Sequence, residues 1–264
     1  MEYCTYTSAS GKICGKPAIN TDVDGSCQCH IKSHWSDVNK YTEFVQRRES
    51  EFNSSTTSIS EEQIETVTKD GACFYRTVAK HIIHNPEAFD MDVENLTERD
   101  IAEKVQSNIT SFIEENKDKQ ILQFGSQTFE DAILETHDEI CSFEHYIDLY
   151  KIFAGDNDYI YEETIDKNGK QRKKKVEIPD RWGSSVEQVA ISMLYGMTIN
   201  VHLLQKFDKR MCRVIEVTKR AKNIRTKLYQ VINPEIEDIE CKVPELNIIL
   251  EKQNITPHYQ YIST

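Results

Sequence analysis

The eight cysteines of this 264-residue chain are unevenly distributed, and this limits how its first 35 residues can fold. Four of them crowd the first 30 residues, together with a histidine, among Gly, Lys, Ser and Asp and few large apolar side chains. A segment of this composition cannot fold on hydrophobic burial alone. The other four cysteines are scattered over the rest of the chain, so the two groups need separate explanations.

A bound Zn²⁺ with four nitrogen or sulfur ligands would supply the folding free energy that this N-terminal segment lacks. The candidate ligands are Cys4, Cys14, Cys27 and His30, with Cys29 and His34 as the alternative pair. The spacing contains no pair of CxxC motifs, so a tail with reactive thiols is the competing interpretation. The segment resembles small zinc motifs that are appended to proteins of large DNA viruses.

Beyond this segment, the apolar spacing predicts a helix followed by a Ser/Thr-rich linker over 36–63, and one globular unit over 64–264. The helices predicted within that unit cover 72–84, 97–115, 142–153 and 184–195. The run 167–175 is predicted to be a charged hairpin tip, and strand candidates dominate after residue 196. Helices that come first and strands that come late predict an α+β fold with a small mixed sheet.

Composition excludes several classes of protein. Lys plus Arg is 32 and Asp plus Glu is 44, a net charge of 32 − 44 = −12, which is the wrong sign for a protein that coats nucleic acid. No apolar run approaches the roughly 18 residues of a membrane span, and the N-terminal residues lack the pattern of a secretory signal. We therefore expect a cytoplasmic chain, a monomer, with neither nucleic acid nor membrane as partner.

The run Asp70-Gly71-Ala72-Cys73 places a thiol where a tight turn opens a helix. The positive end of the helix macrodipole favours the thiolate there, and the N–H groups of the turn could stabilise an oxyanion. A cysteine nucleophile also needs a base close in space, usually a histidine. His258, between Pro257 and Tyr259 in a terminal strand candidate, would hold its imidazole on a rigid element. Taken singly, a buried structural cysteine and a strand histidine are the simpler interpretations.

Three elements in this order resemble the ovarian-tumour (OTU) family of cysteine deubiquitinases. They are the Asp-Gly-x-Cys-aromatic-aromatic-Arg element at 70–76, the Trp182-Gly183 turn before a helix and an Ile-x-Val strand, and the His258-Tyr259 pair. The resemblance covers roughly 64–264. It implies a papain-type cysteine protease fold with a small mixed sheet packed between helices, ubiquitin and polyubiquitin chains as substrates, and no cofactor for catalysis.

The same resemblance implies a role for each matching residue. Cys73 would be the nucleophile and His258 its general base, while Asp70 and the N–H of Cys73 would shape the oxyanion hole. Trp182 and Tyr259 would line the cleft. Many members of the family carry Asp or Asn two residues after the histidine to orient its ring. Here Gln260 stands at that position and stabilises an imidazolium less well than a carboxylate does.

Three other functions stay open from sequence. The chain could be a ubiquitin-binding module with a weak catalytic site, a cysteine protease for a ubiquitin-like modifier, or an interaction protein whose function lies in the N-terminal segment. An activated thiolate at Cys73 would distinguish the first, because it is alkylated faster and with a lower pH midpoint than a structural thiol.

Overall fold

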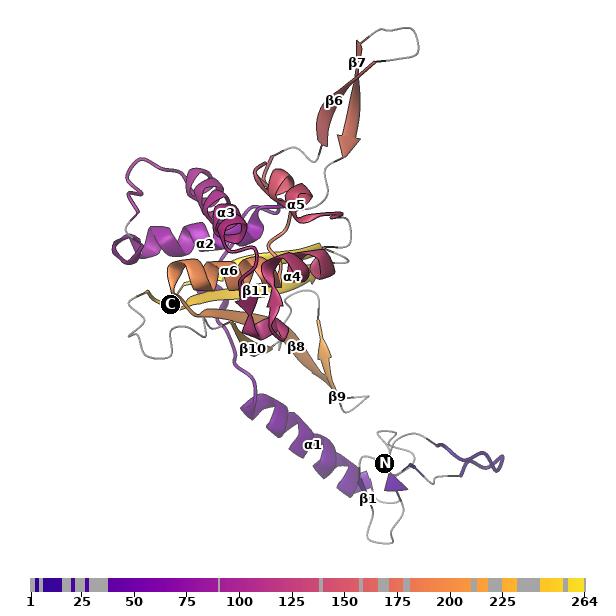
Figure 1. The fold of residues 1–264 in the computed structure, drawn as a ribbon. Helices are drawn as coiled ribbons and strands as arrows, with labels where there is room; N and C mark the ends of the chain where they lie inside the picture. Colours follow the sequence, from indigo (N-terminus) through magenta and orange to yellow (C-terminus); the bar gives the residue numbers. More distant parts are fainter. Residues whose placement is uncertain are drawn as a thin grey trace. The chain divides into compact units, whose positions relative to one another are not determined.

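The fold is described from a computed structural model and divides into two compact units (Figure 1). The smaller unit comprises 1–59 and 204–227, and the larger comprises 60–203 and 228–264. The residues that the structure describes are 3–4, 7–15, 20–21, 27–28, 38–89, 91–137, 140–156, 159–165, 171–177, 181–209, 213–217, 225–231, 243–253 and 256–263.

The described residues form both helices and strands. The α-helices are α1 (Val38–Ser54), α2 (Cys73–His84), α3 (Glu98–Glu115), α4 (Phe129–Thr136), α5 (Phe143–Tyr150) and α6 (Ser185–Tyr195). The 3-10 turns are η2 (Glu61–Gln63), η3 (Pro86–Ala88) and η4 (Leu122–Phe124). The short strands are β1 (Asn20–Thr21), β2 (Cys27–Gln28), β3 (Ile64–Glu65), β4 (Gln120–Ile121) and β5 (Gln127–Thr128). The longer strands are β6 (Tyr159–Ile165), β7 (Gln171–Glu177), β8 (Ile199–Asp208), β9 (Arg213–Glu216), β10 (Arg225–Val231), β11 (Leu246–Gln253) and β12 (Thr256–Ile262).

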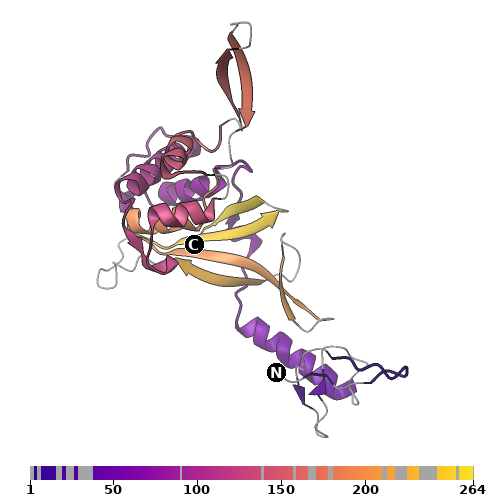
Figure 2. The same cartoon turned by 45° about the vertical axis from the view of Figure 1, so that its right-hand side comes forward.

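The main sheet is mixed. Its strand order is β10-β8-β11-β12-β3, with β9 paired to β8. The β8–β11 pair is parallel, whereas β11–β12 and β12–β3 are antiparallel. Helix α2 packs along β12 and against α3, and Figure 2 shows the C-terminal strands running beside the helices. The predicted α+β class with a small mixed sheet is therefore correct.

Helix starts follow the local sequence. Thr97 caps α3 and exchanges hydrogen bonds with Asp100, and Ser184 caps α6 in the same way with Glu187. Each cap satisfies N–H groups that the first turn leaves without intrahelical partners. Both helices begin close to where the sequence predicts them. Among the described residues, no helix is long and apolar enough to cross a membrane.

Three details differ from the sequence prediction. Residues 171–175, predicted as part of a hairpin tip, belong to β7, which pairs with β6 through seven residues. The bounds of helix α4 were not predicted from the sequence, although Thr128 and Asp131 form a capping box at its start. The helix predicted over 142–153 ends at Tyr150, because the chain then turns into a loop held by side chains of α3.

The two faces of the central strands bury side chains of different polarity. Side chains alternate between faces along a strand, and residues paired in register share a face. One face contributes Val201, Ile248, Tyr259 and Tyr261 to the main apolar core. The opposite face carries Asn200, Glu251, His258 and Gln260, which are buried as well. The sheet thus separates an apolar layer from a buried polar one.

The smaller unit has a second, minor core. Phe44 and Phe52 of α1 are buried with Phe207 of β8, and the rings of Phe52 and Phe207 lie 6.1 Å apart. Arg225 donates to the carbonyl of Asn53, in the last turn of that helix, and to the carbonyl of Thr56 just after it. The C-terminal end of α1 is therefore fixed to β8 and β10 within this unit.

A buried carboxylate fixes the start of α6. Glu187 is fully buried and accepts hydrogen bonds from Tyr146, from the Ser184 hydroxyl and from the Ser184 N–H, with His137 Nε2 at 3.5 Å. Burial alone would raise the pKa of Glu187, but the bonds from His137, Ser184 and Tyr146 outweigh it and hold the pKa at about 2. This network ties α6 to α5 and to the end of α4.

The low pKa of Glu187 makes stability depend on pH. A carboxyl group whose pKa is depressed by folding stabilises above its unfolded pKa of 4.5, and this contribution is lost as pH falls toward about 2. The shift corresponds to about 3 kcal/mol at full effect. We expect the free energy of unfolding, measured by urea at pH 5 to 3, to fall more steeply for the native chain than for Glu187→Gln. Equal slopes would show that the carboxylate is not held in its charged form.

Candidate active site

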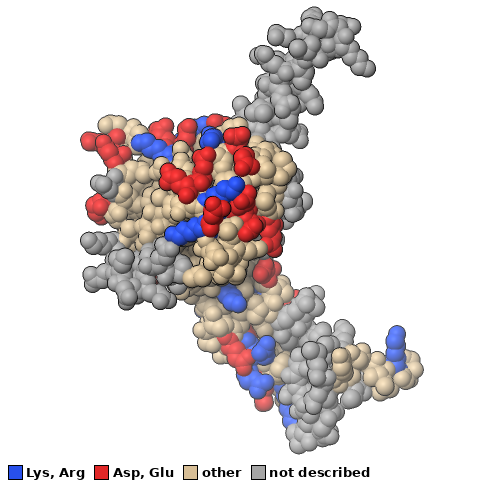
Figure 3. All heavy atoms as spheres, viewed as in Figure 1, with Lys and Arg blue, Asp and Glu red and all other residues tan. Residues whose placement is uncertain are grey.

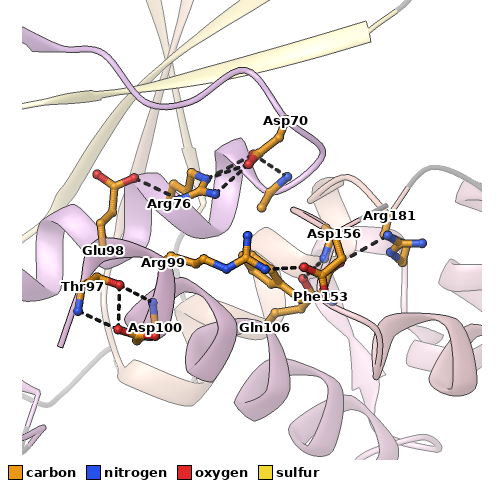
Figure 4. A network of polar contacts seen from close by, with 12 residues as sticks. Asp70, Arg76, Thr97, Glu98, Arg99, Asp100, Gln106, Phe153, Asp156 and Arg181 are labelled. Carbon is orange, nitrogen blue, oxygen red and sulfur yellow. Dashed lines mark hydrogen bonds and ion pairs between the residues drawn. The ribbon is translucent and has the colours of Figure 1, made fainter. Parts of the chain in front are cut away.

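The turn before α2 is held by the carboxylate of Asp70. Its Oδ1 accepts the N–H of Ala72 at 3.1 Å, and its backbone carbonyl accepts the N–H of Cys73 at 3.2 Å. Arg76, one turn into α2, donates Nε and Nη2 to the same carboxylate at 3.0 and 2.7 Å (Figure 4). Helix α2 begins without a side-chain cap at Ala72, so these contacts of Asp70 define how the helix starts.

A chain of charges extends this clamp to the neighbouring elements. Arg76 also lies 3.5 Å from Glu98 at the start of α3, as Figure 4 shows. Lys80 joins Glu98 to Glu65 of β3. In the sequence, Arg76 is only one member of the element at 70–76. In the structure it connects the Asp70 turn, which directly precedes Cys73, to the start of α3.

The thiol of Cys73 lies against the edge of β12. The N–H of Tyr259 donates to Cys73 Sγ at 3.5 Å, within the range for a bond to sulfur. Strand β3 pairs with β12 only at Tyr261 and Ile262 and then leaves the sheet. The sulfur therefore accepts from a strand-edge N–H beyond the end of β3, and a residue adjacent in sequence to His258 contacts the predicted nucleophile.

Burial raises the pKa of the Cys73 thiol to about 11. The side chain is only 2% exposed, and desolvation is the largest cause of the shift. The N–H of Tyr259 lowers the pKa, the charge of Asp70 raises it, and the N–H groups at the start of α2 lower it further. The thiolate expected from the helix macrodipole is thus not the resting form, because desolvation exceeds the effect of those N–H groups.

His258 and Gln260 lie on the same face of β12, since they are two residues apart in one strand. Both are buried, and Tyr259 between them points into the apolar core. The Oε1 of Gln260 has no hydrogen-bond partner among the described residues. A buried amide oxygen without a hydrogen-bond partner costs free energy, and this oxygen is available to accept a hydrogen bond from a donor on that face.

Phe74 connects the three predicted elements. A Cβ built on Gly183 would lie 1.9 Å from the Phe74 ring, so only glycine fits there. On its other side the ring packs against Tyr259, with centroids 5.1 Å apart. The hydroxyl of Tyr259 in turn accepts from Gln188 of α6 at 3.0 Å. The helix of Cys73, the Trp-Gly turn and β12 therefore meet at one aromatic side chain.

The turn at Gly71 is bordered on two sides. A Cβ on Gly71 would lie 2.7 Å from the Ala154 carbonyl oxygen and 3.6 Å from Cδ1 of Trp182. Trp182, one of the residues predicted to line a cleft, is half-buried, and its carbonyl accepts from the Tyr150 hydroxyl. The absence of a side chain at Gly71 is what lets the backbone of the 153–155 loop approach the turn.

The loop beside Gly71 is held by two buried side chains that the sequence did not single out. Gln106 of α3 donates to the carbonyls of Tyr150 and Ile152 and accepts the N–H of Ala154 at 2.9 Å. Arg181 donates to the Phe153 carbonyl at 3.2 Å, and both residues are labelled in Figure 4. A buried glutamine inside an otherwise apolar helical stripe was the one sequence signal for this contact.

The candidate zinc ligands are only partly within the described residues. Cys4 and Cys14 flank a small hairpin, in which Thr7 pairs with Ile13 and the Gly15 N–H donates to the Cys4 carbonyl. The backbone of Cys27 is part of β2, while Cys29, His30 and His34 lie outside the described residues. Within the part of the chain that is described, no group of three or more metal-ligating side chains is present.

No protein-family model matches this chain, and no curated protein sequence matches it. Solved structures with a partial likeness include an OTU deubiquitinase of Wolbachia pipientis wMel bound to ubiquitin, with 14% identity over 75% of this chain and 93% of that one and a TM-score of 0.41. The Hazara virus OTU bound to ubiquitin has 14% identity over 80% of this chain and 96% of that one, with a TM-score of 0.38. The viral OTU domain protease of Taggert virus has 16% identity over 75% of this chain and 77% of that one, with a TM-score of 0.36. With TM-scores this low, the function of this chain has to be argued from its own residues.

The raised pKa of Cys73 predicts how the free protein reacts with a small alkylating reagent. Only the thiolate reacts with such a reagent. Because the pKa is about 11, the thiolate fraction grows about tenfold per pH unit until the pH approaches that value. We expect the alkylation rate of Cys73, followed by peptide mass spectrometry with iodoacetamide, to rise from pH 7 to 9.5 without a plateau. Cys141, which is exposed, serves as the accessible comparison and should react faster. A plateau at Cys73 below pH 8.5 would contradict the burial effect.

Proposed function

We propose that the chain is a cysteine deubiquitinase that hydrolyses the isopeptide or peptide bond after the C-terminal glycine of ubiquitin. The observation that carries the proposal is the contact between Cys73 Sγ and the N–H of Tyr259, which brings the thiol at a helix N-terminus to the strand residue next to His258. The substrate class follows from the sequence elements at 70–76, 182–183 and 258–259 that resemble the OTU family.

The high pKa of the thiol favours a concerted proton transfer. Ionising a thiol of pKa about 11 at neutral pH costs about 5 kcal/mol. His258 removes the thiol proton as Sγ attacks the glycine carbonyl carbon. The tetrahedral intermediate then expels the amine, which takes that proton from the imidazolium, and a thioester remains on Cys73. Water, deprotonated by His258, hydrolyses the thioester and frees the ubiquitin carboxylate and the thiol.

Asp70 has an indirect role in this proposal. Its carboxylate is occupied by Arg76 and the Ala72 N–H, and its carbonyl by the Cys73 N–H. The residue therefore fixes the shape of the turn before α2. The N–H of Cys73 would stabilise an oxyanion only after it leaves the Asp70 carbonyl.

The surface charge suits a basic substrate segment. The chain carries a net charge of −12, and acidic side chains are prominent over the face of the larger unit that Figure 3 shows. The tail of ubiquitin contains arginine and must reach the nucleophile. An acidic surface accelerates the encounter with such a segment by electrostatic steering.

A ubiquitin-binding module with a weak catalytic site is the second candidate. The observation in its favour is the deep burial of Cys73 together with a pKa of about 11. Gln260 at the ring-orienting position also favours this candidate, because an amide stabilises an imidazolium less than a carboxylate does. In this case ubiquitin would bind but the thiol would react slowly or not at all.

The two candidates give different results with ubiquitin that carries a C-terminal electrophile. We expect a one-ubiquitin adduct on the native chain by intact mass, no adduct on Cys73→Ala, and a rate at least tenfold lower on His258→Ala. Cys141→Ala is the matched control and should react like the native chain. Stoichiometric binding of ubiquitin to a folded native chain without any adduct would favour the binding module instead.

We also propose that the N-terminal segment binds a structural Zn²⁺ that the chemistry at Cys73 does not need. The hairpin that carries Cys4 and Cys14 supports this, because it brings the backbone of the two ligand positions to one end of a short segment. The remaining ligands would be Cys27 and His30, or Cys29 and His34.

Metal analysis of the full chain tests this site. We expect about one zinc per chain by mass spectrometry of the metal, lost in Cys4→Ser and Cys14→Ser. Electrophile adduct formation should keep its rate in both variants and in the presence of a chelator. Full zinc content in both variants would overturn the ligand assignment, and loss of the adduct in the chelated native chain would show that the metal supports the active unit.

A further inference from the structure

We propose that Glu251 of β11 is the carboxylate that positions the imidazole of His258, a role for which Gln260 was the sequence candidate. The inference rests on the proposed function, since it assigns a further positioning residue to the same site. It comes from the register of the sheet and from the burial of the polar face opposite the apolar core.

The register places Glu251 directly beside His258. In the antiparallel β11–β12 pair, Glu251 is the partner of His258 and Ile249 is the partner of Gln260. Opposite residues in such a pair have Cβ atoms about 4.5–5.5 Å apart and point to the same face. A glutamate side chain is long enough to reach a histidine ring across this distance.

Burial makes this pair chemically significant. Glu251 is 4% exposed and His258 is 6% exposed. A carboxylate so deeply buried is rarely found without a positive charge or several donors to stabilise it. An imidazolium at His258 is such a charge, and it forms when the ring accepts the proton of Cys73 during the reaction.

The neighbours of His258 explain why a carboxylate is needed. Among the described residues, the side chains that the strands place on its face include Gln260 on its own strand and Glu251 on β11, while the Cys73 thiol contacts the N–H of the next residue, Tyr259. The thiol and the amide are neutral in the resting protein. Glu251 is therefore the group of this set that can offset the positive charge on the ring, and Gln260 can add a neutral hydrogen bond.

The test compares Glu251→Gln with the native chain and with Glu251→Asp. The matched control is Glu245→Gln, which removes a carboxylate just before the same strand, where Glu245 accepts from Asn200. We expect Glu251→Gln to lower kcat/KM on a ubiquitin conjugate about 100-fold, with an unchanged thermal midpoint. Glu251→Asp should recover part of the rate, and Glu245→Gln should keep the native rate.

A second measurement does not depend on catalysis. The pKa of His258 is followed by NMR titration of ¹⁵N-labelled histidine in the Cys73→Ala background, with and without Glu251→Gln. Removing a carboxylate from beside an imidazole disfavours its charged form, so we expect the pKa of His258 to fall by about one unit or more. This readout separates a positioning role from a merely structural one.

The outcomes separate this inference from the proposed function. If the native chain reacts through Cys73 and His258 but Glu251→Gln keeps both the rate and the pKa of His258, Glu251 has no positioning role and the deubiquitinase proposal stands. If the native chain does not react with ubiquitin, the proposed function fails, and the titration alone decides whether Glu251 is paired with His258. Should Glu251→Gln not fold, the same titration with Glu251→Asp decides the question, and an unchanged pKa overturns the inference.

Discussion

The packing of Phe74 between Gly183 and Tyr259 is the contact on which the candidate site depends. It fixes the first turn of α2 against both β12 and the turn that begins α6. A side chain at position 183 would overlap the ring, so the approach of the three elements requires a glycine there. Without this contact the sulfur of Cys73 would not be held at the edge of β12, and His258 would have no defined relation to it.

Close packing of this kind has an electrostatic cost for a nucleophile. The same burial that fixes Cys73 removes water from its thiol and raises its pKa to about 11. Three backbone N–H groups act in the opposite direction but do not compensate for desolvation. The reaction then depends less on a free thiolate at Cys73 than on a base that accepts the thiol proton during the attack. It therefore depends on His258 and on the group that stabilises the imidazolium.

Local signals in the sequence predicted the starts of α2, α3 and α6, whereas only the resemblance to the OTU family linked the three motifs. Thr97 and Ser184 are N-caps that a reader of the sequence can find, and the Asp70-Gly71 turn before Cys73 is equally local. What the sequence could not predict depends on contacts between distant segments. The pKa of Cys73 follows from its burial against β12. The 153–155 loop lies beside Gly71 because Gln106 and Arg181 hold it there.

The position of Glu251 shows the same limit most clearly. A family pattern predicts the residue two places after the histidine, because residues two apart in one strand lie on the same face of the sheet. A residue on the neighbouring strand can occupy the same space, but only the register of the β11–β12 pair reveals which one. A shift of one residue would place Leu250 or Lys252 opposite His258 and move Glu251 to the core face. The charge that balances an imidazolium at His258 is therefore specified by strand pairing rather than by a motif.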